Sequence, residues 1–568
     1  MCSDTCTRNR RLISLLRSCV NQCRYRKPKP KEMYALRTVL PCHPRKLRNG
    51  FYCRAVEDQT AAQSAITVNQ RPNKKKVLVV GSGWAGLGAA HHLCKQEGFD
   101  VMVIEGGYEF GPKNKSLSPD DIGIQGFWYP YRNVFKVVDE IGITPFTNWI
   151  KSAQYSQEGL EVKFPIFLEE SQLPTPFGTL LYSQFDRLPL IDRLTLLPLM
   201  AAIVDFDNTD TAWNKYDSIT ARELLKQFGC SERLFRNVVG PLLQVGLYAP
   251  AEQCSAAATL GMLYYYVLAH QKHFDFVCCR GGVREKIFEP WMESLKSQGC
   301  KFLKGKKVTD VLLDEKSGRV SEVVCEKESF KADAIILAVG VSTLQEIIQN
   351  SATLCTREEF LKVLNLGSID LLTVKLQLDK KVNIPYASNV SSGFDNSSAC
   401  AFFYLNAIYD DCKDNPSTVI QADFYHATDL LPLKDERIVG KVMSCLSNCI
   451  KDFENATVVD REVERLPKSL THFYPGSYKY MMRGSTSFPN LFMAGDWIIN
   501  RHGSWSQEKS YVTGLEAANR VIDCLEEGSF AKIIPLEEDE PHVEALRSLN
   551  RNISEIRDQF PWSTFFLQ

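Results

Sequence analysis

The sequence predicts an α/β protein built on a parallel sheet, with a mixed α+β part inserted into it. Val77–Val80 and Phe99–Glu105 are short apolar runs typical of buried parallel strands, and a helical segment lies between them. A glycine-rich turn, Gly81–Gly86, joins the first run to that helix. Strand-like runs return much later, at 334–340 and 489–497, so we expect a sheet whose strands are scattered along the sequence.

Composition and charge narrow the class of protein. The 568 residues are 44% hydrophobic and 24% charged, which is ordinary globular usage and excludes a wholly disordered or fibrous chain. The formal net charge is zero, but Met1–Val56 carries 14 Lys and Arg against 2 Asp and Glu, a net of +12. The remaining chain is therefore at −12. Because phosphate binding needs a basic folded surface, nucleic acid is not an expected partner.

Cysteine spacing and hydropathy exclude two further classes. The 19 cysteines show no paired framework and no zinc-ligand spacing, so we expect reduced thiols and no metal site. The longest apolar run, Ala256–Ala269, has 14 residues, whereas a membrane-spanning helix needs about 18 or more. We expect a buried helix or an interfacial segment there, and no membrane crossing.

The basic N-terminal segment, 1–56, is predicted to be a plastid transit peptide. It is rich in Arg, Lys, Ser, Thr and Cys, and it lacks the continuous apolar region of a secretory signal. Its end, Phe51–Ala55, contains a Cys-Arg-Ala sequence similar to those where plastid transit peptides are cleaved, which favours plastid over mitochondrion. The alternative is a disordered basic arm that stays attached. Residues 57–73 are predicted to be a polar linker.

The glycine turn matches the dinucleotide-binding fingerprint. Gly81 would make the tight turn, Gly83 would let the backbone approach a pyrophosphate, and Gly86 would let helix and strand pack closely. The helix begins around Trp84 and Ala85, and unpaired amides at a helix N-terminus bind phosphate groups.

An acid ends the second strand of this fingerprint. Glu105 stands 24 residues after Gly81 and would accept hydrogen bonds from the adenosine ribose. A carboxylate there repels a 2′-phosphate, which disfavours NADP. The fingerprint alone does not separate FAD from NAD.

The C-terminal third carries the discriminating motif. Pro489–Trp497 is an apolar strand ending in Gly495-Asp496, and Gly503-Ser504 leads into a predicted helix, Gln507–Leu525. Here the sequence resembles the flavin amine oxidase superfamily, most closely its carotenoid (phytoene/zeta-carotene) desaturase-like branch. In that family a Leu-Phe-x-Ala-Gly-Asp strand and a Gly-Ser helix form the second flavin-binding motif.

The resemblance implies an FAD-binding Rossmann-type (glutathione-reductase-like) domain that is discontinuous in sequence. It implies that Asp496 binds a ribityl or pyrophosphate group, with Gly495 giving close approach. Amides at Gly503 and Ser504 would point at the flavin N1 and C2 carbonyl, where a helix N-terminus stabilises negative charge. It also implies that the Val308 backbone lies at the adenine. No cysteine lies between 503 and 515, so the FAD is expected to be non-covalent.

The resemblance also sets the expected domains. The FAD-binding domain would comprise 74–130, 275–343 and 481–530; the mixed α+β substrate domain 131–274 and 344–480; and a C-terminal helical tail 531–568.

The catalytic residues are predicted least directly. The sequence departs from the family pattern at Gly106–Lys113, where an Arg and a Gly-Gly pair are usual, and Gln125 stands where the family often has a histidine. His502 is a candidate to lie over the flavin, against an alternative as a turn histidine. Glu508 is a second candidate, against an alternative as a dipole partner in the first helical turn.

These observations predict a plastid FAD-dependent oxidoreductase that desaturates a lipophilic, carotenoid-like isoprenoid by hydride transfer to flavin, with quinone or oxygen as acceptor. Aromatic clusters in the inserted part suit a small lipophilic substrate, and their exposed part would allow peripheral membrane contact. One alternative is an amine or polyamine oxidase. Another is a flavin-binding isomerase or assembly factor without net turnover.

Overall fold

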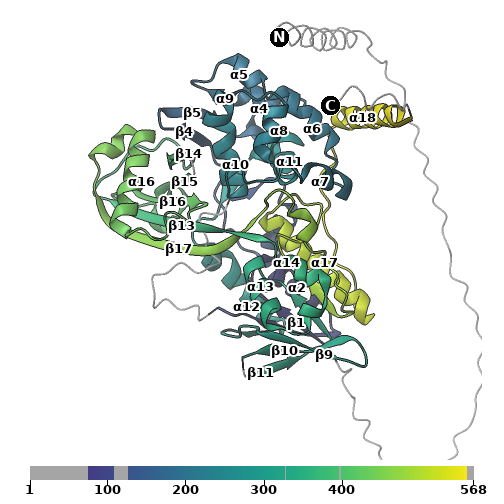
Figure 1. Ribbon diagram of the computed structural model, residues 1–568. Coiled ribbons are helices and arrows are strands. Elements are labelled where there is room, and N and C mark those ends of the chain that lie inside the picture. The colour runs from purple at the N-terminus through teal and green to yellow at the C-terminus, as the bar shows by residue number, and fades with distance from the viewer. Residues whose placement is uncertain (1–73, 108–125, 327, 396–397, 560–568) are drawn as a thin grey trace, which may run out of the picture. The chain divides into compact units, whose positions relative to one another are not determined.

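The computed structural model describes residues 74–107, 126–326, 328–395 and 398–559 (Figure 1). All of the described residues belong to one compact unit of the chain, Gln70–Gln568. The predicted transit peptide, the whole predicted linker and Gln125 lie outside the described residues, as does most of the departure at Gly106–Lys113.

The first sheet has five parallel strands in the order β18-β12-β1-β2-β8. These are β1 (Lys75–Val80), β2 (Phe99–Ile104), β8 (Lys301–Leu303), β12 (Ala334–Leu337) and β18 (Leu491–Met493). Three separate stretches of the chain therefore supply one sheet. This confirms the predicted α/β class.

Alternate side chains of β1 enter two different apolar cores. Val77 and Val79 pack with the helices of one face, whereas Leu78 and Val80 pack with the layer on the other. The first face is covered by α2 (Trp84–Cys94), α3 (Arg132–Ile141), α12 (Glu289–Ser297) and α17 (Gln507–Leu525). The second is covered by the antiparallel strands β9 (Asp310–Asp314), β10 (Arg319–Cys325) and β11 (Glu328–Lys331), with α13 (Val341–Asn350) and α14 (Glu358–Val363).

The second sheet has eight strands in the order β17-β13-β16-β15-β14-β4-β5-β6, antiparallel except where β14 meets β4. Its strands are β4 (Ser152–Ser156), β5 (Gly159–Phe164), β6 (Gln184–Phe185), β13 (Gly367–Leu378), β14 (Ser388–Asp395), β15 (Ser398–Tyr404), β16 (Val419–Tyr425) and β17 (Val458–His472). The helix α16 (Asp435–Cys449) packs its apolar face on this sheet. A separate two-stranded ribbon joins β3 (Gly126–Trp128) to β7 (Phe276–Cys278).

A cluster of short helices completes the inserted part (Figure 1). These are α4 (Phe177–Tyr182), α5 (Leu190–Leu194), α6 (Met200–Asp205), α7 (Asp210–Tyr216), α8 (Ala221–Gln227), α9 (Glu232–Leu234), α10 (Gly240–Leu247), α11 (Ala256–Leu263) and, after β15, α15 (Leu405–Ile408). The apolar run at 256–269 is α11 followed by a π-helical turn, Tyr264–Leu268. None of the described helices is long and apolar enough to span a membrane.

The tail returns to the inserted part. Ile534 exchanges two hydrogen bonds with Asn133, and α18 (Pro541–Gln559) reaches α6 through Arg547, whose side chain donates to the carbonyl of Val204 at 3.2 Å. Asp539 accepts a hydrogen bond from Tyr264 and pairs with Arg547. Apolar contacts add to these, since Ile533 and Leu536 pack against the core and Val543 is buried.

Two edges of the FAD-binding domain differ from the prediction. Helix α3, placed in the substrate domain from sequence, contributes Val134 and Val137 to the core with α2 and α17. Helices α13 and α14 contribute apolar side chains to the core behind the parallel sheet. This core includes residues as far along the chain as Leu366. Their apolar faces complete the burial of the sheet, so this domain extends beyond the expected boundaries at 130 and 343.

Candidate active site

The three fingerprint glycines have three different surroundings. Gly81 has φ +104°, and a Cβ there would lie 2.3 Å from the Ala338 carbonyl oxygen. A Cβ on Gly86 would lie 1.9 Å from the Gly81 carbonyl oxygen, so only glycine allows this approach of helix to strand. Gly83 has no neighbouring atom within 4 Å of its Cβ position. Its backbone is open to a ligand.

Glu105 organises the loop after β1. Its Oε2 accepts hydrogen bonds from the backbone N–H of Ser82 at 2.9 Å and from the Ser82 hydroxyl at 2.8 Å. Its Oε1 accepts from the N–H of Gly107 at 3.0 Å. The carboxylate therefore fixes the glycine loop against the end of β2, at the position where the sequence predicts a ribose contact.

The second predicted motif follows β18. Gly495 has φ +146°, and its N–H donates to Thr513 Oγ1 of α17 at 3.0 Å. Asp496 borders a large cavity, and burial raises the pKa of its carboxyl, while the nearby Lys509 opposes this. Burial lowers the pKa of Lys509 to about 8, and its Nζ donates to the Ser504 carbonyl at 2.8 Å.

Other predicted cofactor residues have packing roles. Gly503 has φ +80° and lies against the Tyr265 ring, and the Ser504 hydroxyl donates to the Ala258 carbonyl. Val308 is buried in the core behind the parallel sheet, and Ala85 is buried in α2. At the start of α17 the residues lining the cavity are instead Trp505, Ser506, Gln507 and Ser510. The start of α17 therefore borders the cavity.

His502 and Glu508 line a second cavity of about 20 Å³, whose lining shares no residue with that of the large cavity. The Glu508 carboxylate accepts hydrogen bonds at the N-terminus of α3, and burial raises its pKa to about 7 against the opposing effect of those donors. Burial lowers the pKa of His502 to about 4, so the imidazole is neutral near pH 7. Neither side chain is among the described residues that line the large cavity.

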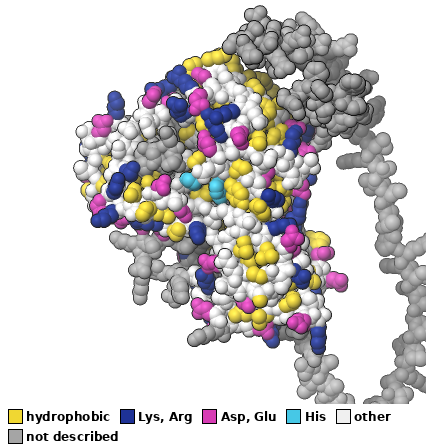
Figure 2. Space-filling view, viewed as in Figure 1, with side chains coloured by type: hydrophobic (Ala, Val, Ile, Leu, Met, Phe, Trp, Pro, Cys, Tyr) yellow, Lys and Arg dark blue, Asp and Glu magenta, His cyan; other side chains and the backbone are white. Residues whose placement is uncertain are grey.

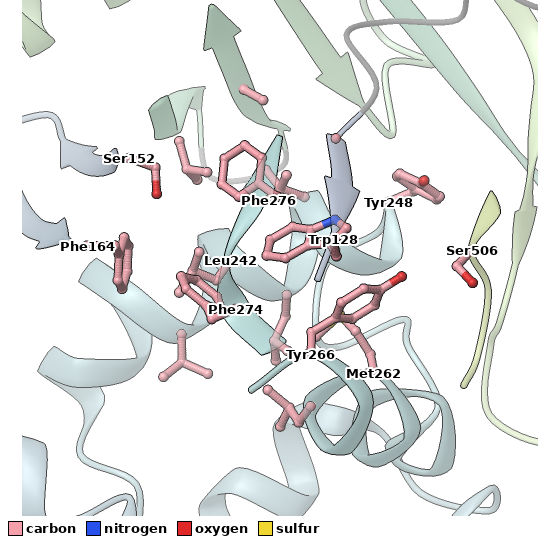
Figure 3. A pocket seen from close by; sticks show the side chains of 18 of the residues that line it. Trp128, Ser152, Phe164, Leu242, Tyr248, Met262, Tyr266, Phe274, Phe276 and Ser506 are labelled. Atoms are coloured by element: carbon pink, nitrogen blue, oxygen red, sulfur yellow. The ribbon is translucent and has the colours of Figure 1, made fainter. Parts of the chain in front are cut away.

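The large cavity has a volume of about 510 Å³ (Figure 3). One end reaches Gly83, Trp84 and Asp496, and the other is walled by α4 and the segment after α5. Between these ends its surface is largely apolar and aromatic; it includes Trp128, Phe164, Leu242, Met262, Phe274 and Phe276 (Figure 3). These residues come from β3, β5, α10, α11 and the β7 region, so only the folded chain brings them together.

Charge is scarce in this cavity. Among the described residues that line it, Arg193 and Asp496 carry the only formal charges, and they stand at opposite ends. Tyr248 and Tyr425 also line it, and burial raises the pKa of each phenol well above its usual value. Both therefore stay protonated near neutral pH and do not serve as bases.

A flavin fits the nucleotide end of this cavity. Gly83 leaves room at the loop, and Trp84 Nε1 is a buried donor with no hydrogen-bond partner among the described residues. The Ser506 hydroxyl caps α17 by accepting from Lys509 N–H at 2.8 Å, which places a helix N-terminus at the cavity. These groups suit an anionic, hydrogen-bonding ligand.

His270, His273 and Glu537 form the described cluster closest to a metal-ligand set, with ligand atoms within 4.8 Å of one another. Glu537 is already paired with Lys272 at 2.8 Å and with His273 at 3.3 Å. The cluster joins the tail to the inserted part and lies outside the set of residues that line the large cavity.

A parallel sheet with a glycine-rich loop, joined to a large apolar cavity, defines a dinucleotide-binding enzyme. The family described as "Flavin containing amine oxidoreductase" matches residues 84–522. The chain belongs to this family and is an FAD-dependent oxidoreductase. This confirms the superfamily that the two sequence motifs indicated.

Individual relatives are distant. The carotenoid phi-ring synthase of Chlorobaculum tepidum is 22% identical over 297 residues, which are 48% of this chain and 43% of that protein. This similarity supports the carotenoid desaturase-like branch. The matched part spans less than half of that relative.

Solved structures show the same fold. The cyclohexylamine oxidase of Brevibacterium oxydans has a TM-score of 0.59 at 13% identity, covering 80% of this chain and 100% of that one. A putrescine oxidase bound to putrescine has a TM-score of 0.59 at 15% identity, covering 79% and 99%.

Proposed function

We propose that the protein removes hydrogen from a lipophilic, carotenoid-like isoprenoid, using non-covalently bound FAD. The observation that carries the proposal is the cavity of about 510 Å³, which starts at Gly83 and Asp496 and is lined mainly by apolar side chains. A long hydrocarbon gains free energy by leaving water for such a surface, roughly in proportion to the apolar area buried. The similarity to the carotenoid phi-ring synthase supports the same substrate class.

The residues of this chain would orient the substrate and exclude water. Trp128, Phe274 and Phe276 form one aromatic wall, with ring centroids 5.5 and 4.8 Å from Trp128. Bound flavin supplies the hydride acceptor, so the protein needs few titratable groups. Asp496, whose pKa is raised by burial, is the only acid among the described residues of the lining and would hold or pass a proton there. We propose quinone or oxygen as the final acceptor.

One observation favours the amine oxidase alternative. Tyr248 lies 4.5 Å from Trp505 and 5.2 Å from Tyr425 between ring centroids, and all three line the cavity. Such a group of aromatic faces binds cations. However, Asp496 is the only described acid in the lining, and Arg193 at the far end would repel a polyamine. The apolar surface therefore favours the isoprenoid.

Anaerobic titration of the flavin tests the two substrates. Polyenes and polyamines are added separately to the purified holoenzyme, and the flavin absorbance at about 450 nm is followed. Bleaching by a polyene is the expected result. Bleaching by a polyamine alone would support the amine oxidase instead, and bleaching by neither would contradict both.

A matched pair of variants localises the substrate. Val245→Phe narrows the cavity and is expected to slow polyene bleaching by about 10-fold or more, with flavin content unchanged. Val459→Phe makes the same change on an exposed position of β17 and is expected to have no effect. Equal rates in both variants would place the substrate elsewhere.

We also propose that residues 1–56 direct the protein to the plastid, on the basis of their +12 charge and the Cys-Arg-Ala sequence. Import into isolated chloroplasts, followed by mass spectrometry of the mature N-terminus, tests this. Cleavage near Arg54 is expected. Import by mitochondria, or an uncleaved product, would overturn the assignment.

A further inference from the structure

Five large apolar side chains are exposed on two neighbouring segments of the inserted part. Phe177 and Leu181 of α4 are 57% and 68% exposed, and Leu190, Ile191 and Leu194 of α5 are 62%, 71% and 43% exposed. They lie within 18 consecutive residues, whereas the other exposed large apolar side chains of the described chain are spread over the rest of its length. We call these five residues the α4–α5 patch. Figure 2 shows hydrophobic side chains along the upper edge of the molecule, where α5 lies in Figure 1.

The same segments form a wall of the large cavity. Thr179 and Leu180 of α4 line the cavity, as do Arg193 of α5 and the following Leu196 and Leu197. In α4 the exposed residues Phe177 and Leu181 are four apart, which puts them on one side of the helix. The two segments thus separate the cavity from an apolar outer surface by the thickness of a single helix.

Burial inside the protein does not explain the patch. Exposed apolar residues scattered singly are normal, but five within 18 residues are a concentration typical of a surface that contacts an apolar partner. The stretch from α4 to α6 also has buried apolar residues, namely Pro176, Leu188 and Leu199. It therefore has a core of its own and still presents the five side chains of the patch to the outside.

Charges around the patch suit a phosphate-bearing layer. Lys163 pairs with Asp186, and Arg187 with Glu158, so these four groups neutralise one another. The arginines at 193 and 233 form no ion pair with the described residues; their side chains donate to the carbonyls of Leu188 and Arg187. Asp192 is one further acid on α5. Two unpaired guanidinium groups beside apolar side chains match the boundary between acyl chains and headgroup phosphates.

We infer that the α4–α5 patch docks onto the surface of a lipid bilayer. The five apolar side chains enter the acyl region, and Arg193 and Arg233 meet phosphate groups. The docking is independent of turnover. That a lipophilic substrate then passes between the two segments into the cavity rests on the proposed function.

Flotation with vesicles tests the docking. The full-length holoenzyme is mixed with vesicles of phosphatidylcholine, which has no net charge, because the basic segment 1–56 would bind anionic lipid by charge alone. The wild-type protein is expected to float with the vesicles. Leu181→Glu with Ile191→Glu is expected to lower the bound fraction by about fivefold or more.

A matched variant and two readouts make the result decisive. Leu312→Glu with Val459→Glu changes two exposed apolar positions outside the patch and is expected to float like the wild type. Flavin absorbance shows that each variant is folded, and bleaching by detergent-solubilised polyene is expected to be unchanged in the patch variant. Equal flotation of the two double variants, or no flotation of the wild type, overturns the inference.

A second copy of the chain is the competing occupant of the patch. Light scattering without vesicles distinguishes it: a dimer that only the patch variant disrupts, with no flotation of the wild type, would assign the patch to self-association. Failure of polyene bleaching with normal flotation would overturn the proposed function and leave the docking intact.

Discussion

Glu508 and Asn133 are joined by two hydrogen bonds, from the Asn133 backbone N–H at 2.9 Å and from its side-chain amide at 2.6 Å, both to Oε1. The other carboxylate oxygen accepts from the N–H of Val134 at 2.8 Å. A carboxylate from α17 therefore satisfies the free amides at the start of α3 and complements its dipole. This relationship joins two residues that are 375 positions apart in the sequence.

Removing this carboxylate is expected to destabilise the fold without changing the chemistry. Glu508→Ala leaves buried N–H donors unsatisfied and is expected to lower the free energy of unfolding by about 3 kcal/mol. Urea unfolding measures the change, and turnover per bound flavin is expected to stay at the wild-type level. Asp523→Ala, at an exposed position of the same helix, is the control. A lost turnover at normal stability would return Glu508 to the catalytic candidates.

His502 makes stability depend on pH. Its pKa is about 4 in the folded protein because of burial, below the ordinary value of 6.5. The folded state therefore binds fewer protons than the unfolded state. The contribution of neutral His502 to the free energy of unfolding is complete above pH 6.5 and is lost as the pH falls toward 4. This amounts to at most about 3 kcal/mol. Unfolding of wild type and His502→Gln at pH 7 and pH 4.5 is expected to show a shallower loss in the variant. Parallel pH profiles would contradict the assignment.

Substitutions at two glycines of the loop are expected to have different effects, one on folding and the other on flavin binding. Gly86→Ala is expected to prevent stable folding, because its Cβ would lie 1.9 Å from the Gly81 carbonyl oxygen. Gly83→Ala meets no protein atom and is expected to fold, but its methyl group would occupy the space left for a pyrophosphate. Purified Gly83→Ala should therefore show normal circular dichroism and little absorbance at about 450 nm. Gly440→Ala, in open space on α16, should keep its flavin.

The first fingerprint could be predicted from sequence because its determinants are local. A β-branched run, three glycines and an acid follow one another within 29 residues, and each acts on its own neighbours. The helix at Gln507–Leu525 has the predicted bounds for the same reason, since Ser506 caps its start and its apolar face repeats every turn.

The cavity could not be predicted because its residues meet only through tertiary structure. Trp128, Leu242 and Trp505 have no shared pattern in the sequence, although the structure places all three on one surface. The same limit applies to His502 and Glu508, which stand beside the flavin motif in sequence but turn toward α3 and the tail. Sequence proximity to a motif is a weak guide once a helix begins, because successive side chains point in different directions.

The tail is expected to be needed for stability. Asp539 accepts from Tyr264 and pairs with Arg547 in a largely buried contact. Asp539→Ala leaves the guanidinium without its partner and is expected to cost about 3 kcal/mol. Glu538→Ala, the exposed neighbour, removes a carboxylate of the same charge and should be nearly neutral. Thermal unfolding and limited proteolysis measure both. An Asp539→Ala protein as stable as the wild type would contradict the prediction.

The strand β12 lies between β1 and β18 in the parallel sheet. While the chain is being synthesised, β1 and its neighbour β2 emerge first, and the neighbour on the other side of β1, β12, follows only after about 250 more residues have left the ribosome. This apolar edge of β1 is unprotected for all that time, and the sheet is complete only when β18 arrives near the C-terminus. The sheet of this domain can therefore be completed only when nearly the whole chain has been synthesised.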